Sequence, residues 1–349
     1  MRELIDKIAN SQYAKKEDFL YVLDNICGQD LDYLYQKGAE VCKKHYGNQI
    51  FIRGLIEVSS YCKNDCYYCG LRKSNKKCQR YRLTKEEILM CCETGYKEGF
   101  RTFVLQGGED PKFTDEIIVD IVSTIKTKYP DCAITLSLGE KTRQQYKKYR
   151  VAGADRYLLR HETINETHYQ KLHPKTMLLK DRIQCLNDLK ELGFQTGAGF
   201  MVGSPFQTNE NIAEDLFFLQ NFKPQMIGIG PFIPHCDTPF SDYQSGSVEK
   251  TLVCLALLRL TNPKVLLPAT TALGSVDENG RIKGVLAGAN VIMPNLSPKE
   301  VREKYMLYNN KLSTGLETGE YINQLKELFV KVGYNITVSR GDSLNVFSS

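Results

Sequence analysis

Eight short apolar segments of β type recur along the chain, and most of them are separated by amphipathic helical segments. The eight predicted strands lie at residues 50–59, 102–108, 133–139, 156–162, 195–203, 226–232, 264–271 and 289–295. Near-continuous apolar strands separated by helices are typical of a parallel sheet that is covered on both faces. Eight such units predict an α/β protein built on a (βα)8 barrel of the TIM type, open or closed.

Helical segments fill most of the connections between these strands. Several begin at Thr, Asp or Asn and end at Gly, as capped helices do. The predicted helices cover residues 84–100, 114–129, 141–153, 180–193 and 209–222. The last unit is the weakest, because residues 281–289 offer little more than a short helix between the seventh and eighth strands.

The pattern divides the chain into three predicted regions. Residues 1–48 form an N-terminal helical extension, in which apolar residues at helical spacing indicate two helices within 14–47. Residues 49–308 form the barrel, and residues 309–349 form a C-terminal extension packed on it.

Composition narrows the class of protein. The chain has 42% hydrophobic and 25% charged residues, which is ordinary for a globular protein, and no apolar run approaches the about 18 residues of a membrane span. Its charged N-terminus lacks an apolar signal core, so we expect a cytoplasmic protein whose 12 cysteines stay out of disulfides. The net charge of +5 is spread without a basic block, so we expect no nucleic-acid and no membrane partner.

Three cysteines, Cys62, Cys66 and Cys69, fall within eight residues directly after the first predicted strand. A structural zinc site takes four ligands, and a disulfide framework takes an even number of cysteines. A cubane iron–sulfur cluster fits better, since three thiolates can hold three irons and leave the fourth open to another ligand. The spacing therefore predicts an iron–sulfur centre at which another ligand can bind and react. A zinc site is the alternative.

Polar residues close most of the predicted strands, and in a barrel these ends face one mouth. Arg160 and Glu162 alternate across His161 at the end of the fourth strand, so the two charges share one face. Charges are costly against buried helices, so this face should be the inside of the barrel. His161 then points outward and is expected to be structural, and a structural ion-pair network is the alternative for Arg160 and Glu162.

The Cys-x3-Cys-x2-Cys spacing, with Tyr68 before the last cysteine and after the first strand of a (βα)8 pattern, resembles the radical S-adenosylmethionine superfamily. Within it, six segments closely resemble the FeFe-hydrogenase maturases of the HydE family. They lie at residues 68–88, 105–111, 155–165, 228–235, 268–274 and 288–295. The resemblance implies one 4Fe–4S cluster on the three cysteines and S-adenosylmethionine chelated to its open iron. The implied reaction is reductive cleavage of this cofactor to a 5'-deoxyadenosyl radical, which the protein shields from water.

The resemblance also implies roles for individual residues. Gly108 and Glu109 would meet the amino group of the cofactor, Glu162 its ribose or amino group, and Arg182 its carboxylate. Further residues implied at the cofactor or the cavity wall are Tyr68, Gln106, Arg160, Met201, Met293 and Tyr305. The resemblance implies that the substrate is contacted by the hydroxyl groups of Thr135, Ser137, Thr270 and Thr271. Capping, packing and ion pairing are the alternatives for these residues.

The family resemblance implies a function in assembly of the FeFe-hydrogenase active site, the H-cluster. The implied substrate is a small organometallic species, a cysteine-bound iron that carries carbonyl and cyanide ligands. The implied partners are two companion maturases, a radical S-adenosylmethionine tyrosine lyase and a scaffold GTPase, and a reductant such as ferredoxin or flavodoxin. Some HydE proteins carry three further cysteines near the C-terminus for an auxiliary cluster. Residues 306–349 contain none, so we expect one cluster per chain.

Two other classes of function stay open at this stage. One is a biosynthetic enzyme, either an amino-acid mutase resembling methylornithine synthase or a sulfur-inserting enzyme resembling biotin synthase. Sulfur insertion needs an auxiliary cluster deep in the barrel, where the predicted strands offer only Cys132. The other is a non-catalytic iron–sulfur or zinc assembly module, which would explain the cysteines but not the polar strand ends.

Overall fold

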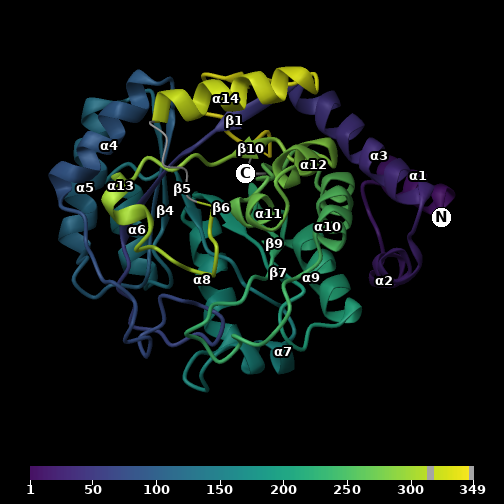
Figure 1. Ribbon diagram of the computed structural model, residues 1–349, viewed down its shortest axis with the longest axis horizontal. Coiled ribbons are helices and arrows are strands. Elements are labelled where there is room, and N and C mark those ends of the chain that lie inside the picture. Colours follow the sequence, from purple (N-terminus) through teal and green to yellow (C-terminus); the bar gives the residue numbers. More distant parts are fainter. Residues whose placement is uncertain (313–317, 346–349) are drawn as a thin grey trace.

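The computed structural model describes residues 1–312 and 318–345, in which parallel strands lie inside a layer of helices (Figure 1). Six strands pair side by side in one parallel sheet. In spatial order they are β2 (Gly54–Ser59), β3 (Thr102–Gly107), β4 (Ala133–Ser137), β5 (Arg156–Leu158), β6 (Gln195–Ala198) and β8 (Met226–Ile227).

Single residue pairs close this sheet into a ring. Residues 265–269 occupy the seventh position, where Met226 pairs with Leu266 and Pro268 pairs with Val291. The eighth position is β10 (Val291–Ile292), which pairs in parallel with β1 (Gln49–Ile52), and β1 leads directly into β2. All eight predicted strands contribute, and the predicted (βα)8 barrel is confirmed as a closed one.

Two short strands lie above the ring on the side of the mouth. β7 (Met201–Val202) follows β6 and pairs in parallel with β9 (Gly230–Pro231), which follows β8. The fifth and sixth predicted strands therefore each split into two short pieces.

The helices cover the outside of the ring (Figure 1). The longer ones are α4 (Lys85–Lys97), α5 (Asp115–Lys128), α6 (Arg143–Val151), α8 (Leu179–Glu191), α9 (Asn209–Phe222) and α10 (Val248–Thr261). The shorter ones are α7 (Glu166–Leu172), α11 (Thr271–Val276), α12 (Gly280–Leu286) and α13 (Lys299–Arg302). Thr84, Thr142 and Thr208 each accept a hydrogen bond from the backbone N–H three residues on. The predicted start at Thr84 is therefore a capped one, whereas Thr114, the other predicted threonine start, makes no side-chain cap.

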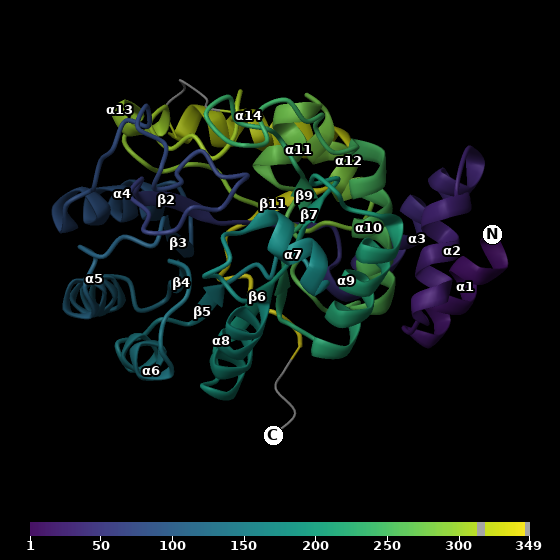
Figure 2. The same ribbon diagram turned by 90° about the horizontal axis from the view of Figure 1, so that it is seen from below.

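Three N-terminal helices pack beside α10 (Figure 2). They are α1 (Arg2–Ser11), α2 (Lys16–Asn25) and α3 (Gln29–Tyr46), so α1 adds to the two helices predicted within 14–47. Every residue of α10 from Thr251 to Thr261 is buried, because α3 covers the side of α10 that would otherwise face water. Among the described residues, none of the helices is both long and apolar enough to span a membrane.

The C-terminal part of the chain closes the lower end of the barrel. After α14 (Thr318–Lys331), β11 (Asn335–Thr337) pairs in parallel with β1. The fully buried Arg156 of β5 then donates to the carbonyls of Arg340 and Gly341 at 2.7 and 3.1 Å, and to Asp342 Oδ1 at 2.7 Å. The parts of the predicted C-terminal extension at 313–317 and 346–349 lie outside the described residues.

We expect Asp342→Asn to loosen this closure in a pH-dependent way. Burial alone would raise the pKa of the Asp342 carboxyl, but hydrogen bonds from Arg340 and the charge of Arg156 outweigh burial and lower it. Because the folded pKa is below the unfolded value of about 3.9, the stabilisation is present above that pH and declines as the pH falls.

At pH 7 the substitution should reduce the free energy of unfolding by about 1 kcal/mol, since solvent screens a partly exposed carboxylate. Urea unfolding at several pH values, with Asp242→Asn as an exposed control, measures the loss. A variant as stable as the wild type at pH 7 would contradict the role given to this carboxylate.

Candidate active site

The loop that follows β2 carries the three clustered cysteines. Cys62, Cys66 and Cys69 are half-buried and free. Gly108, which follows β3, lies against the base of this loop: a Cβ atom there would come within 2.2 Å of the Tyr61 carbonyl oxygen and 2.8 Å of Cys62 Cβ. Only glycine fits so close to the backbone, so Gly108 allows the cysteine loop to sit directly on the end of β3.

Two charged groups fix the conformation of the cysteine loop. Asp65 accepts two hydrogen bonds of 2.8 Å from the guanidinium of Arg72. Arg80 donates to the carbonyls of Leu71 at 2.9 Å and Arg72 at 2.8 Å. A charged fork that bonds to several carbonyls holds an irregular loop where no ladder of backbone hydrogen bonds can.

The spacing of the thiols is informative about the metal they could hold. In the part of the chain that the structure describes, three ligand atoms gather within 4.8 Å only at His235, Cys236 and Asp237. The three loop sulfurs are therefore spread more widely than one zinc ion with bonds of about 2.3 Å would hold them. Burial raises the pKa of Cys62 and Cys66, and that of Cys69 to about 12, so iron must displace protons when it binds. The donor set fits a polynuclear iron–sulfur cluster.

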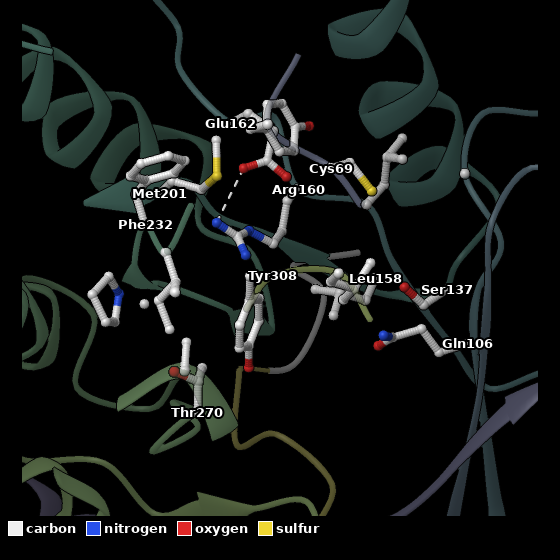
Figure 3. Close-up of a pocket in the computed structure, with 18 of the residues that line it drawn as sticks. Cys69, Gln106, Ser137, Leu158, Arg160, Glu162, Met201, Phe232, Thr270 and Tyr308 are labelled. Carbon is white, nitrogen blue, oxygen red and sulfur yellow. Dashed lines mark ion pairs between the residues drawn. The ribbon is translucent and has the colours of Figure 1, made fainter. Parts of the chain in front are cut away.

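A cavity of about 300 Å³ opens beside the cysteine loop (Figure 3). We call it the upper cavity. The predicted residues that line it are Tyr68, Cys69, Gln106, Ser137, Arg160, Glu162, Arg182, Met201, Thr270 and Tyr305. They come from many different strand ends, which the closed ring brings to one mouth.

Arg160 and Glu162 both point into the upper cavity, where their side chains form an ion pair of 3.0 Å (Figure 3). Arg160 Nη2 and Glu162 Oε2 are the two atoms of this ion pair, whereas Arg160 Nε is buried and has no partner among the described residues. Glu162 also has a φ of 68°, a left-handed conformation that costs a non-glycine residue on the order of 1–3 kcal/mol. A strained backbone beside a buried charge pair and an unpartnered guanidinium nitrogen is typical of a ligand site.

The neighbours of this pair are fixed by other contacts. His161 points away from the cavity, as predicted: its Nε2 lies 3.2 Å from Asp215 Oδ1, and both side chains are fully buried. Arg182, at the start of α8, donates from Nη1 to the Arg160 carbonyl at 2.8 Å and forms an ion pair through Nε with Glu140. The guanidinium of Arg182 is thereby held at the cavity wall.

A second cavity of about 130 Å³, here the lower cavity, shares Gln106, Leu158, Arg160 and Thr270 with the upper one. Thr135 and Met293 line it, together with Arg53. Among the described residues, five of its buried polar atoms have no partner: Arg53 Nε and Nη2, Arg160 Nε, Thr135 Oγ1 and Thr270 Oγ1. Burial, and then the charge of Arg156, lower the pKa of Arg53, because both disfavour its positive charge. An anion bound beside the guanidinium would offset this cost.

Several predicted site residues lie outside both cavities. Gly108 lies under the cysteine loop, and Thr271 begins α11 without lining a cavity. The Glu109 carboxylate accepts a hydrogen bond of 2.9 Å from the backbone N–H of Glu140 and lies 3.2 Å from Lys63 Nζ. Glu109 therefore supports the turn at 139–140, of which Gly139 lines the upper cavity.

Sequence reasoning missed some of the lining residues. Arg53 could have been identified from the sequence, because an arginine inside an otherwise apolar strand is unusual. Tyr308 carried no such signal. Lys311, which lines neither cavity, carried none either: it forms an ion pair with the fully buried Glu57 and donates to the Tyr305 carbonyl at 2.9 Å, and both partners are contacts that no local pattern marks. Tyr308 lines the upper cavity, where burial raises its pKa to about 12.

Comparisons with known proteins agree with this arrangement. The model of the Radical SAM superfamily matches residues 56–219. The FeFe-hydrogenase maturase subunit HydE of Thermotoga maritima is 43% identical over 313 residues, which cover 89% of this chain and 88% of that protein. The 3-methylornithine synthase of Methanosarcina acetivorans is 29% identical over 309 residues, covering 88% and 87%. A crystal structure of methylornithine synthase matches with a TM-score of 0.84 and 26% identity, over 96% of this chain and 97% of that one.

The fold, the cysteine loop and these matches define the class of protein: the chain belongs to the radical S-adenosylmethionine superfamily and, within it, to the HydE family of FeFe-hydrogenase maturases. It is an enzyme of that superfamily, whose cofactors are a 4Fe–4S cluster and S-adenosylmethionine. The predicted family, enzyme class and cofactors are confirmed.

The contact under the cysteine loop gives a direct test of its geometry. We expect Gly108→Ala to push the loop off β3, because a backbone carbonyl 2.2 Å from the new methyl group cannot move alone. Overpacking of this kind costs about 1–3 kcal/mol, and the reconstituted variant should hold less iron than the wild type. The matched control is Gly107→Ala, whose methyl group would meet Val58 Cγ2 at 3.3 Å, a contact that a shift of a few tenths of an ångström in that side chain relieves. Equal iron content per chain in the two variants would contradict the role of Gly108.

Proposed function

We propose that this chain is a maturase of the FeFe-hydrogenase active site that acts on a small, cysteine-bound iron species carrying carbonyl and cyanide ligands. The observation that carries the proposal is the pair of neighbouring cavities, which share four lining residues. The upper one adjoins the cysteine loop, and the lower one presents unpartnered guanidinium and hydroxyl groups. The 43% identity to a protein named as a hydrogenase maturase supports it.

In this proposal the cysteine loop and the upper cavity hold the cofactors. Cys62, Cys66 and Cys69 would hold the 4Fe–4S cluster through their thiolates and leave it able to bind S-adenosylmethionine. The bound cluster would supply the electron for reductive cleavage of S-adenosylmethionine to methionine and a 5'-deoxyadenosyl radical. Arg182 offers a fork to the cofactor carboxylate, and Glu162 accepts hydrogen bonds from its ribose or amino group.

The walls of the upper cavity orient the cofactor and exclude water. Tyr68, Gln106, Met201 and Tyr305 line it, and Tyr305 accepts a long hydrogen bond of 3.5 Å from Gln106. Gly108 and Glu109 act indirectly in this proposal, the first by seating the cysteine loop and the second by supporting the turn at 139–140.

The lower cavity binds the substrate. Arg53 and Arg160 provide positive charge, while Thr135 and Thr270 provide hydroxyl groups that have no other partner. Such a set suits the carboxylate of cysteine and the cyanide ligands of the iron, both of which accept hydrogen bonds. Ser137 completes the wall of the upper cavity and Met293 that of the lower one.

The composition of the lower cavity favours this substrate over the alternatives. A diamino acid, the substrate class of a mutase, would need a carboxylate for its second ammonium group. No carboxylate is among the described residues that line the lower cavity, and no cysteine is there to hold the auxiliary cluster of a sulfur-inserting enzyme. A 29% identical 3-methylornithine synthase keeps the mutase as the second candidate.

Substitutions should separate cluster assembly from cofactor binding. We expect Cys62→Ala, Cys66→Ala or Cys69→Ala to lose iron and with it cleavage of S-adenosylmethionine. Arg182→Ala and Glu162→Ala should keep their iron, because they lose contacts to the cofactor and none to the cluster. Each should weaken cofactor binding by about one to two decades, as a lost charge-assisted hydrogen bond of about 1.5–3 kcal/mol implies. Iron analysis and equilibrium binding measure both effects. Unchanged cofactor binding in both variants would show that the two residues have structural roles only.

The maturase function is tested in an anaerobic mixture of apo-hydrogenase, the companion tyrosine lyase and scaffold GTPase, reductant and this protein. Hydrogen production should require the protein. The double variant Thr270→Val, Thr271→Val should still cleave S-adenosylmethionine without substrate but should support less maturation. Thr270 makes no side-chain cap to α11, so its hydroxyl can be removed without uncapping that helix.

The matched control is Thr124→Val, Thr127→Val on the outside of α5, where both hydroxyls bond only to carbonyls of their own helix. This control should mature the hydrogenase as well as the wild type does. Undiminished hydrogen production in a mixture that lacks the protein would reject the maturase function and favour the mutase.

A further inference from the structure

A third hollow, of about 420 Å³, lies on the surface beside the cysteine loop and shares no lining residue with the upper or lower cavity. We call it the basic hollow. Its wall includes Met177, whose Sδ atom lies 3.9 Å from the Sγ atom of Cys66. A single side chain therefore separates this surface from a cysteine that we assign to the cluster.

The charge of the basic hollow is positive and largely uncompensated. Lys63, Lys73 and Lys76 line it, and the exposed Lys175 lies between two further lining residues. In the described part of the chain, Lys73, Lys76 and Lys175 form no ion pair. The acidic residue in the wall, Asp65, is already neutralised by the two hydrogen bonds from Arg72.

We propose that the basic hollow docks a small acidic ferredoxin, which delivers the electron that the cluster needs; this rests on the cluster assignment of the proposed function. The upper cavity cannot serve as the entry side, because the cofactor fills it when the electron arrives. Free lysines on one face attract an acidic partner and speed its association. Ferredoxins are one-electron carriers of low potential, which suits a 4Fe–4S acceptor.

The proposed step is a simple electron transfer. One electron leaves the reduced ferredoxin and enters the cluster beside Cys66, so the ferredoxin is oxidised by one electron. No bond forms or breaks at the docking surface, and no proton is transferred there. The electron is then consumed in cleavage of S-adenosylmethionine.

The test variant reverses two charges, Lys73→Glu with Lys76→Glu. Neither side chain makes a hydrogen bond or ion pair with the described residues, so their substitution should leave the fold intact. The matched control is Lys44→Glu with Lys128→Glu. These two exposed lysines lie near the C-terminal ends of α3 and α5, away from the basic hollow, and the control changes the net charge equally.

Binding of an acidic ferredoxin to the reconstituted protein is measured first, by equilibrium titration at low and high salt. Wild-type affinity should fall as the salt concentration rises, since screening weakens contacts between exposed charges. The test variant should bind at least about tenfold more weakly than the wild type at low salt, and the control should bind as the wild type does. A test variant with wild-type affinity, or a loss of equal size in the control, would overturn the docking site.

Turnover is measured second, as formation of 5'-deoxyadenosine with either reduced ferredoxin or dithionite as the electron source. The test variant should be slower than the wild type with ferredoxin and equal to it with dithionite. If the wild type does not turn over even with dithionite, the cluster assignment is wrong, and with it the proposed function. That outcome differs from failure of the docking site, which leaves turnover with dithionite intact. Efficient reduction by a flavodoxin but not by ferredoxin would overturn the proposed partner.

Discussion

The closed ring of parallel backbone pairing determines where every side chain of the site lies, because it turns all strand ends toward one mouth. Its least regular section is the seventh position, where single residue pairs replace a ladder. There the fully buried Arg259 of α10 donates hydrogen bonds of 2.8 Å to the carbonyls of Gly288 and Val265 and reaches Asn290 Oδ1 at 3.1 Å. Asn290 in turn accepts the N–H of Leu267 at 2.9 Å. A buried cation thus adds to the few backbone hydrogen bonds of this section and helps to hold the segment that leads to Thr270, which lines both cavities.

The interior of the barrel contrasts with its lower end. At the lower end the guanidinium of Arg156 is satisfied by carbonyls and by Asp342 of the C-terminal segment. In the lower cavity, Arg53, Thr135 and Thr270 bury polar atoms that have no partner among the described residues. Each such atom costs about 1–3 kcal/mol unless a ligand satisfies it. The fold gives up this stability, and tolerates the strained backbone of Glu162, in order to keep a site prepared for a polar ligand.

Much of this could be predicted from the sequence, for physical reasons. All eight strands were identifiable because buried parallel strands are apolar on both faces, and the three cysteines because thiols so closely spaced have few other uses. The inward direction of Arg160 and Glu162 followed from the period of two in a strand. Long-range contacts could not be predicted: the ion pair of Lys311 with Glu57 joins residues far apart in sequence, and no local pattern marks it. The position of Glu109 was also hidden, since a glutamate after two glycines suits a ligand contact and a turn equally well.

We propose that radical chemistry in the upper cavity acts on an iron species held in the lower one. Infrared spectroscopy of a synthetic cysteine-bound iron complex with carbonyl and cyanide ligands tests it most directly, because the stretching bands of these ligands report on the substrate itself. Binding to the protein alone should shift these bands slightly, and bands of a new species should replace them only when the reconstituted protein, S-adenosylmethionine and reductant are all present. Unchanged bands while the protein cleaves S-adenosylmethionine would contradict the claim.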